Sequence, residues 1–307
     1  MHILITGHLG YIGPIAVRLF KAAGHRVSGL DVGYFRDCLS PGQQAVAPDH
    51  EIVRDVRDAL AEDFSGVDAV VHLAGENISA RRWTRAQKER IRSSRVDNTM
   101  LLCTTLASLD APPRVLLCGS ALGYYGDRAS ELLGEDSDPG EDFLGRVTWE
   151  WERATLGATS AGIRVLNLRF GLVLTATGGL LGRMLPLFRF GLGGRLGSGK
   201  QYMSWISRHD AVRAMVHLLE APDVSGPVNI SSPAPVTNSQ FTKTLAKAVK
   251  RPALFWVPEL ALRISQGQIT ESVMASARMD ATKLAASGFS FEHPDLDSAL
   301  SWALGDR

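Results

Sequence analysis

Short apolar runs alternate with helical patterns through the first two thirds of the chain. Strands are expected at Ile3–Thr6, Arg26–Leu30, Glu51–Val53, Ala69–Leu73, Arg114–Cys118 and Arg164–Arg169. Apolar residues at helical spacing predict helices at Pro14–Ala23, Thr84–Ser93 continuing to Leu109, Leu144–Ser160 and His209–Glu220. Strands that alternate with helices in this way predict an α/β fold with a doubly wound parallel sheet.

The pattern changes after Phe170. Leu180–Phe190 is apolar at helical spacing, and Gly191–Lys200 is a glycine-rich loop. After Pro227–Ile230, one more strand of the sheet, the chain continues as a proline-rich loop, a helix, the strand Phe255-Trp256-Val257 and further helices. We therefore predict a nucleotide-binding domain of residues 1–170 and 205–232. A smaller, discontinuous C-terminal substrate domain would comprise residues 171–204 and 233–307.

The first predicted strand ends in the glycine-rich turn Gly7-His8-Leu9-Gly10-Tyr11-Ile12-Gly13, and a helix follows. Gly7 permits a tight turn, Gly10 leaves room for a phosphate, and Gly13 allows the helix to pack on the strand. Main-chain N–H groups at such a helix N-terminus bind a pyrophosphate. The order of strand, turn, helix and second strand predicts a Rossmann-type dinucleotide site rather than a plain tight turn. Its expected contact residues are Gly7, Gly10, Tyr11, Ile12 and Gly13.

Asp31 stands at the end of the second predicted strand. An acid at this distance from the glycines bonds the hydroxyls of the adenosine ribose, whereas the 2′-phosphate of NADP would meet a like charge. The expected cofactor is therefore NAD, with NADP disfavoured. Arg36 could soften the repulsion, although it lies further along the loop beside Asp37. The alternative for Asp31 is an ordinary turn residue at a strand end.

The composition excludes several classes of protein but does not indicate a function. The 307 residues carry a formal net charge of +1, which does not point to nucleic acid or to an anionic membrane. No apolar run approaches a membrane span, and no signal-type segment precedes the first strand. Cys38, Cys103 and Cys118 lack metal-ligand spacing and are expected to be reduced thiols, the last two in the core. A cytoplasmic protein without a metal site is predicted.

Three motifs resemble the extended short-chain dehydrogenase/reductases, which include sugar-nucleotide epimerases and dehydratases. They are Gly7-x-x-Gly10-x-x-Gly13, Asp55-Val56-Arg57-Asp58 and His72-Leu73-Ala74-Gly75. By this resemblance, Asp55 and Val56 would contact the adenine. Leu73, Ala74 and Gly75 would line the pyrophosphate and the ribose.

Five further segments resemble one atypical branch of that family, whose members are called epimerase family proteins and whose substrate is not well defined. The segments are Ala74–Ile78, Arg82-Trp83-Thr84, Ser120–Gly126, Met184-Leu185-Pro186 and Gly197–Ile206. The resemblance covers nearly the whole chain. One departure concerns Asp31, because members of the branch often carry a basic residue near this position. The departure supports NAD here.

A second departure concerns the chemistry. The family's usual signature is Tyr-x-x-x-Lys on the helix after the fifth strand, where the phenol transfers a proton and the lysine lowers its pKa. None of the five tyrosines has a lysine four residues later. Where the pair is expected, the sequence has Phe143 and Val147. The standard mechanism is therefore unavailable at these positions.

Ser120 and Tyr125 are the candidates to replace the missing pair. Ser120 follows the fifth strand, and Tyr125 comes five residues later. A serine hydroxyl and a phenol near a substrate carbonyl could bond it while hydride arrives at its carbon. The alternatives are a strand-end cap for Ser120 and a packed ring for Tyr125.

Other signals carry less functional weight. The segment Gly194–Lys200 resembles a phosphate-binding P-loop, but Gln201 replaces the required Ser or Thr and no strand precedes it. The loop is expected to border the substrate cleft, with Lys200 and Gln201 as polar contacts, or else to be a flexible turn. The basic stretch Arg81–Arg95 could attract a phosphate, although a solvated helix face is favoured. His72 is expected to be a core histidine.

Two function hypotheses remain. The first is an NAD(P)-dependent oxidoreductase or epimerase that acts on a small carbonyl or hydroxyl substrate, with sugar nucleotides among the candidates. The second is a non-catalytic dinucleotide-binding protein, acting as a redox sensor or partner-binding module. The missing Tyr-x-x-x-Lys pair favours the second, whereas the polar loop Ser120–Tyr125 and the complete substrate domain favour the first. The expected partner is a small molecule, and a homodimer stays open.

Overall fold

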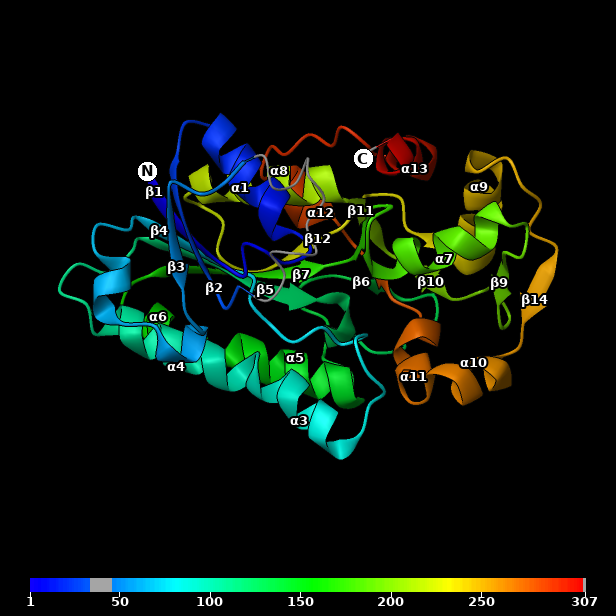
Figure 1. Ribbon diagram of the computed structural model, residues 1–307, viewed down its shortest axis with the longest axis horizontal. Coiled ribbons are helices and arrows are strands. Elements are labelled where there is room, and N and C mark those ends of the chain that lie inside the picture. Colours follow the sequence, from blue (N-terminus) through cyan, green and yellow to red (C-terminus); the bar gives the residue numbers. More distant parts are fainter. Residues whose placement is uncertain (34–45, 306–307) are drawn as a thin grey trace.

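The computed structural model describes residues 1–33 and 46–305, and Arg36, Asp37 and Cys38 lie outside these residues. Its centre is a seven-stranded parallel sheet in the order β12-β7-β5-β4-β1-β2-β3 (Figure 1). The strands are β1 (His2–Thr6), β2 (Arg26–Asp31), β3 (His50–Val53), β4 (Ala69–His72), β5 (Val115–Ala121), β7 (Arg164–Phe170) and β12 (Gly226–Ile230). The predicted doubly wound parallel α/β sheet is confirmed.

Helices cover both faces of this sheet (Figure 1). One face carries α1 (Gly13–Ala22), α8 (Arg208–Glu220) and α12 (Thr282–Ala286). The other carries α3 (Arg85–Ser93), α4 (Val96–Ala107), α5 (Phe143–Arg153) and α6 (Leu156–Ser160). Alternate residues of β1 face opposite sides, so Ile3 and Ile5 join Phe20 of α1 in one core while Leu4 joins Leu102 of α4 in the other. Burial on both faces explains why the central strands β1 and β4 are almost continuously apolar.

Two predicted long helices are interrupted in the structure. The expected helix from Thr84 to Leu109 is divided between α3 and α4, and Arg95 stands at the start of α4. The Arg95 guanidinium folds back onto the carbonyls of Glu76 and Ile91, at 2.9 and 3.3 Å. The expected helix Leu144–Ser160 is divided between α5 and α6 at Thr155, whose hydroxyl donates to the Glu152 carbonyl at 2.7 Å.

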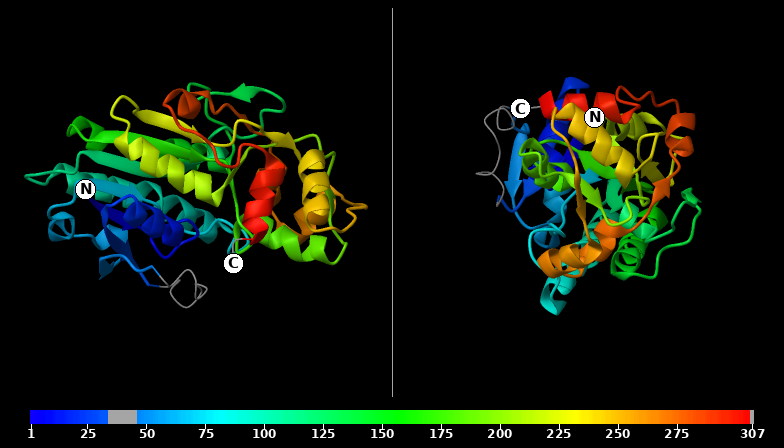
Figure 2. Two further views of the ribbon diagram at one scale, coloured as in Figure 1. Left: turned by 90° about the horizontal axis from the view of Figure 1, so that it is seen from above. Right: turned by 90° about the vertical axis from the view of Figure 1, so that its right-hand side faces the viewer.

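The C-terminal part has its own core around Trp205, Phe241 and Leu300. Its helices are α7 (Gly179–Arg189), α9 (Asn238–Ala248), α10 (Glu259–Gln266), α11 (Ile269–Met274) and α13 (Leu296–Gly305). Three short strand pairs join them: β8 (Leu172–Leu174) with β11 (Trp205–Ser207), β10 (Tyr202–Met203) with β13 (Val236–Thr237), and β9 (Gly194–Leu196) with β14 (Phe255–Val257). A fourth pair, β6 (Leu132–Leu133) with β15 (Arg278–Met279), joins the loop after β5 to this region. Figure 2 shows α7, α9, α10 and α13 together at one end of the molecule. The residue boundaries of the two domains stay a prediction.

Several sequence interpretations are settled by burial. Cys103 and Cys118 are buried, as expected for core thiols. Trp151 is buried while Trp149 is exposed, which fits their two-residue spacing on α5. Among the described residues, no helix has both the length and the apolar character to cross a membrane.

Candidate functional site

The turn after β1 has the geometry of a phosphate-binding loop. Gly7 has φ of +72°, a conformation that favours glycine, and its N–H donates to the Leu30 carbonyl at 2.9 Å. A Cβ on Gly7 would lie 2.8 Å from the main-chain nitrogen of Ala74. The turn therefore packs directly on the chain that leaves β4, and only glycine fits there.

A side chain at Gly10 and a side chain at Gly13 would meet different main-chain groups. The Gly10 N–H donates to the Gly7 carbonyl at 3.0 Å, and a Cβ on Gly10 would lie 3.1 Å from that oxygen. A Cβ on Gly13 would lie 2.2 Å from the His8 carbonyl. Gly13 thus packs on the turn itself rather than on a strand, which corrects the expected reason for this glycine. Ile12 precedes α1, and its carbonyl accepts the first helical bond, from Ala16, at 3.1 Å.

The Asp31 carboxylate lies beside this turn and is 7% exposed. One oxygen accepts the Leu9 N–H at 3.2 Å, and the other accepts the Gly33 N–H at 3.1 Å. Each carboxylate oxygen can accept more than one hydrogen bond, so both retain capacity for a ribose hydroxyl. Asp31 is thus fixed at the end of β2 with unused acceptor capacity.

The ends of β3 and β4 extend the same edge of the sheet. The N–H groups of Leu73 and Ala74 donate to the main-chain and side-chain oxygens of Thr6, at 3.1 and 3.4 Å. Asp55 caps the short turn Val56–Asp58 and accepts from the Arg57 N–H at 3.1 Å. The residues expected around the adenine, ribose and pyrophosphate therefore follow neighbouring strand ends, where α/β proteins bind nucleotides.

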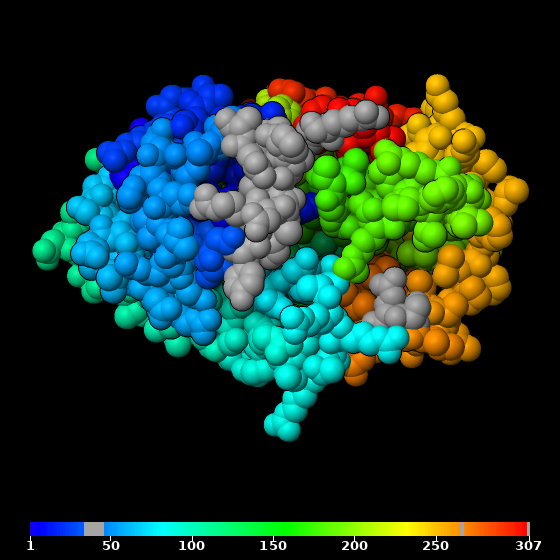
Figure 3. Space-filling model, viewed as in Figure 1, coloured from blue at the N-terminus to red at the C-terminus, as the bar shows by residue number. Residues whose placement is uncertain are grey.

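Figure 3 shows a hollow between the cyan segment around α3 and the green α7. Gly75 opens toward the Arg95 side chain, because a Cβ there would lie 3.5 Å from the guanidinium carbon. An added methyl group would thus be in ordinary contact. The predicted contact residues that follow β1 to β4 thus lie at one edge of the sheet. Which of them touch a cofactor stays a prediction.

The Tyr11 side chain bonds a distant part of the chain, which the sequence did not indicate. Its hydroxyl donates to the carbonyls of Val173 and Gly178, at 2.7 and 3.3 Å. A Cβ on Gly178 or Gly179 would lie 2.7 or 2.5 Å from Tyr11 side-chain atoms. Burial raises the pKa of this phenol above its usual value. Tyr11 therefore joins the glycine turn to the connection between β8 and α7, and its hydroxyl is not offered to a phosphate.

Polar groups also gather at the end of β5, but they bond one another. The Ser120 hydroxyl donates to the Glu152 carboxylate at 2.6 Å. Arg169 of β7 donates to both oxygens of that carboxylate, at 2.8 and 2.9 Å. Although burial alone would lower it, the hydrogen bonds and charge of Glu152 raise the pKa of the Arg169 guanidinium. Ser120 is 3% exposed, Arg169 2% and the Glu152 side chain 11%, so this ion pair is largely shielded from solvent.

Tyr125 belongs to the same buried network. Its hydroxyl donates to Asn229 Oδ1 at 2.6 Å and accepts from Arg169 Nη1 at 3.0 Å. The side chain has no exposed surface. Burial raises its pKa to about 12, against the opposing charge of Arg169. This geometry does not support the predicted proton transfer by Tyr125, because the phenol is inaccessible and its pKa moves away from neutrality.

The sequence interpretation missed Glu152, Arg169 and Asn229. A signal existed for Arg169, since a charged residue inside an apolar parallel strand needs a buried counter-ion. Its guanidinium also lies over the Tyr124 ring, 3.5 Å from the centroid. No spacing rule identified Glu152 or Asn229 as its partners, because they come from α5 and β12.

Two packed apolar side chains, Phe143 and Val147, occupy the positions of the absent Tyr-x-x-x-Lys pair. Phe143 meets the Trp83 ring edge to face, with centroids 5.2 Å apart. Val147 is buried. Lys88 lies over the Phe143 ring, 4.9 Å from the centroid, and so places a cation near the start of α5.

His72 is a core histidine, as predicted. Its two ring nitrogens lie 2.7 Å from the Thr6 hydroxyl and 3.0 Å from the Thr99 hydroxyl, and the side chain is fully buried. Burial, together with the charge of Arg95, lowers its pKa to about 4. The imidazole is therefore neutral at physiological pH.

The side chains of the two expected substrate contacts, Lys200 and Gln201, differ in exposure. Lys200 is exposed, whereas Gln201 is 7% exposed and donates to the Leu196 carbonyl at 3.1 Å. Gln201 thus closes its own loop in this arrangement. A contact of either residue with a substrate stays a prediction.

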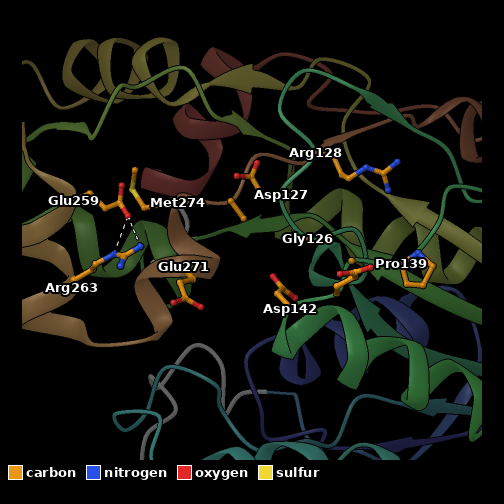
Figure 4. A pocket seen from close by; sticks show the side chains of 12 residues that line it. Gly126, Asp127, Arg128, Pro139, Asp142, Glu259, Arg263, Glu271 and Met274 are labelled. Atoms are coloured by element: carbon orange, nitrogen blue, oxygen red, sulfur yellow. Dashed lines mark hydrogen bonds and ion pairs between the residues drawn. The ribbon is translucent and has the colours of Figure 1, made fainter.

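A cavity of about 600 Å³ opens beside the loop after Tyr125. Figure 4 shows the Glu259–Arg263 ion pair on one wall and Asp142 across from it. Asp142 caps α5 by accepting the Gly145 N–H at 2.6 Å. None of the cavity's lining residues belongs to the glycine turn, so it lies outside the cofactor edge. In the described part of the chain, no group of three His, Cys, Asp or Glu residues could hold a metal ion.

Comparison with models of protein families shows which family the chain belongs to. Residues 3–231 match the model of the NAD dependent epimerase/dehydratase family. The chain belongs to this family. Residues 257–303 match a second model, a domain of unknown function called DUF1731. The resemblance inferred from the glycine turn and the following motifs is thus confirmed.

Similar curated proteins carry the family's name without a stated substrate. Epimerase family protein Mb2239 of Mycobacterium bovis is 41% identical over 274 residues, which cover 84% of this chain and 90% of that protein. Epimerase family protein YfhF of Bacillus subtilis is 32% identical and covers 100% of this chain and 99% of its own length. The family is therefore shown along the whole chain.

Solved structures agree with the fold. Human epimerase family protein SDR39U1 (isoform 2), crystallised with NADPH, superposes with a TM-score of 0.87 at 28% identity and covers 100% of both chains. The UDP-glucose 4-epimerase of Thermotoga maritima, with UDP-glucose, gives a TM-score of 0.80 at 18% identity, covering 99% of this chain and 98% of that one. The second likeness shows the fold alone. Together with the family model, the first establishes a dinucleotide-binding protein.

Proposed function

We propose that this protein binds NAD and transfers hydride to or from a small carbonyl or hydroxyl substrate, as an oxidoreductase or epimerase. Sugar nucleotides are the candidate substrates, because a neighbour of the same fold holds UDP-glucose. The observation that carries the proposal is the arrangement of Gly7, Gly10 and Asp31 at one sheet edge. The turn leads directly into the N-terminus of α1, whose first N–H groups have no partners within the helix and can bind a pyrophosphate, and Asp31 supplies a carboxylate for the ribose.

The preference for NAD follows from the buried place of Asp31. Two N–H groups hold its carboxylate, so it cannot swing away from an added 2′-phosphate without losing both bonds. A dianionic phosphate beside a fixed carboxylate is disfavoured by repulsion, whereas two ribose hydroxyls are favoured by hydrogen bonds. The human relative holds NADPH, so the cofactor choice of this chain needs its own test.

The test is calorimetric titration of the unchanged protein and of Asp31→Ala with NAD and with NADP. We expect NAD to bind more tightly by about 1–3 kcal/mol, and Asp31→Ala to narrow that difference. Asp58→Ala removes an exposed carboxylate after β3 and serves as the matched control. Tighter binding of NADP to the unchanged protein would overturn the preference.

The chemical step is proposed without Tyr125 as the acid. Ser120 and Tyr125 fix the end of β5 through Glu152 and Asn229. They act as positioning residues for the chain that continues into Leu122 and Gly123. The proton that the reaction requires would then come from another group of the substrate, from water or from a side chain outside this network.

The second candidate, a non-catalytic dinucleotide-binding sensor or partner module, is favoured by the same buried network and by Phe143. The two functions separate in a screen of carbonyl and sugar-nucleotide substrates that follows NADH absorbance. Formation or consumption of NADH with any of them supports an oxidoreductase. An epimerase regenerates its cofactor, so sugar-nucleotide products are also separated chromatographically. NAD binding without any product supports the sensor. The small-molecule substrate and the cytoplasmic location stay predictions.

A further inference from the structure

Arg95 carries a positive charge beside the chain that follows β4, and no carboxylate of the described residues forms an ion pair with it. Its Nη1 donates to the carbonyls of Glu76 and Ile91, at 2.9 and 3.3 Å, and to the Ser94 hydroxyl at 3.5 Å. The Glu76 carboxylate accepts instead from Gln87 Nε2, at 2.9 Å. A partly buried charge without a counter-ion is unfavourable, so a ligand that accepts its hydrogen bonds would be stabilised there.

Two of the three guanidinium nitrogens of Arg95 keep their donors. Within the described residues Nε and Nη2 have no partner, and neither atom is fully enclosed. Burial, which the charge of Glu76 partly opposes, lowers the pKa of the guanidinium to about 10, so it stays charged at neutral pH. Because the guanidinium is a rigid planar fork, the bonds of Nη1 also fix the direction of the other two nitrogens.

The Arg95 guanidinium lies between the ends of β4 and β5. A Cβ on Gly75, which follows β4, would lie 3.5 Å from its carbon. The same carbon lies 5.2 Å from the centroid of the Trp151 ring. Trp151 donates to the Thr99 hydroxyl at 2.9 Å and lies against β5, since a Cβ on Gly119 would lie 3.3 Å from its ring. Arg95 is thus held at the edge of the sheet where β4 and β5 end.

The order of the strands determines which part of a dinucleotide would reach this place. Asp31 at the end of β2 is the expected partner of the adenosine ribose, and the turn after β1 is that of the pyrophosphate. β4 lies on the other side of β1 from β2, and β5 lies next to β4. Because the pyrophosphate is at the centre of the cofactor, the nicotinamide and its ribose would extend over the ends of β4 and β5.

The face of α5 that packs against Arg95 is uncharged. Val147 precedes Trp151 by one helical turn, so the two side chains share this face. Both are buried. A positive charge for the nicotinamide half of the cofactor would therefore come from Arg95, at the start of α4.

We propose that Arg95 binds the nicotinamide half of the cofactor, with Nε and Nη2 donating to oxygens of its ribose and phosphate. The inference rests on the proposed binding of NAD at this edge of the sheet, and it requires no turnover. Charge-assisted hydrogen bonds of this kind are stronger than neutral ones. Arg95 and Asp31 would then hold the two halves of the cofactor on opposite sides of the glycine turn.

The test is calorimetric titration of Arg95→Met with NAD and with AMP, which lacks the nicotinamide half. The variant keeps most of the side-chain length but loses the charge and the donors. It is expected to bind NAD at least about tenfold more weakly and to change AMP binding less than about twofold. Arg92→Met is the matched control, because the guanidinium of Arg92 is partly exposed and bonds Glu150 and Asp97. It should bind both ligands normally.

Arg95→Lys is a second variant that keeps the charge, and it serves if Arg95→Met does not fold. Its single nitrogen cannot bond the Glu76 carbonyl and also donate to the cofactor from a second, fixed nitrogen. NAD should therefore bind more weakly than to the unchanged protein, with AMP binding unchanged. Circular dichroism checks that each variant is folded.

The proposal is overturned if the folded Arg95 variants bind NAD as tightly as the unchanged protein. It is also overturned if NAD and AMP binding weaken equally, or if Arg92→Met weakens NAD binding to the same extent. Absence of NAD and NADP binding by the unchanged protein would overturn this inference and the proposed function together. Tighter binding of NADP would overturn only the preference for NAD, and Arg95→Met is then compared with NADP in its place.

Discussion

The ends of β1 and β2 and the ends of β5 and β7 lie along one edge of the same sheet, yet they use polar groups in opposite ways. At the first pair, Asp31 accepts two main-chain bonds and retains free acceptor capacity. At the second, the Glu152 carboxylate accepts hydrogen bonds from the Ser120 hydroxyl and from Nε and Nη2 of Arg169, in a largely buried network. The first region therefore keeps acceptor capacity that a ligand could use, whereas the polar groups of the second bond one another.

This difference shows that a dinucleotide fold can keep its binding edge while its usual chemical end becomes structural. The binding edge depends on glycines and main-chain donors, which need no acid–base group. The chemical end depends on an accessible phenol of lowered pKa, and here Tyr125 is buried with a raised pKa. Membership of the family therefore predicts the cofactor site better than it predicts the reaction.

The largest effect is expected from breaking the buried ion pair. Arg169→Met or Glu152→Leu leaves one uncompensated buried charge and should lower the free energy of unfolding by about 3–5 kcal/mol. The double variant removes both charges and should recover much of this loss. Urea unfolding of all three variants provides the measurement. A cost below about 1 kcal/mol for both single variants would show that the network is not structural.

Acidification should weaken the protein through His72, which lies between the two regions. Its pKa is about 4 in the folded protein and about 6.5 when unfolded. Between these values the unfolded chain binds a proton that the folded chain does not. The free energy of unfolding therefore falls as pH falls from about 6.5 to about 4, by about 3 kcal/mol in all.

Replacing His72 by Gln should remove this part of the pH dependence. Urea unfolding of both proteins between pH 7 and pH 4 provides the measurement. Parallel curves for the two proteins would contradict the assignment.

The smallest effect is expected from Tyr125→Phe. The change removes the hydroxyl that bonds Asn229 and should lower the free energy of unfolding by about 1 kcal/mol. NAD affinity should stay unchanged. Once a substrate is known, turnover should also be nearly unchanged, whereas loss of an acid–base group would reduce it by about 10²–10⁴. A reduction of that size would restore Tyr125 to the chemistry.

The glycine turn and the acid beside it could be located from the sequence because their signals are local. Gly7, Gly10 and Gly13 lie within one turn, and Asp31 ends the next strand. Their spacing is fixed by the strand–turn–helix geometry. The role of Tyr11 was not readable, because its partner Val173 comes from a distant part of the chain.

The chemical end could not be derived in the same way. Ser120, Glu152, Arg169 and Asn229 come from four different elements, and no spacing in the sequence relates them. The sequence indicated correctly that Phe143 and Val147 leave no Tyr-x-x-x-Lys pair. It could not indicate that Tyr125 is fully buried, because burial depends on how β12 and the loop after β5 pack around it.

The most direct test compares NAD binding by the unchanged protein, Gly10→Val and Gly134→Val. Gly10 lies at the binding edge, whereas Gly134 precedes Glu135, whose carbonyl accepts from Arg169, and has open space around it. Calorimetry should show that Gly10→Val, while folded, binds NAD at least about 100-fold more weakly, because its side chain fills the pyrophosphate's place. Gly134→Val should bind NAD normally. Undiminished NAD affinity in folded Gly10→Val would contradict the account and place the cofactor elsewhere.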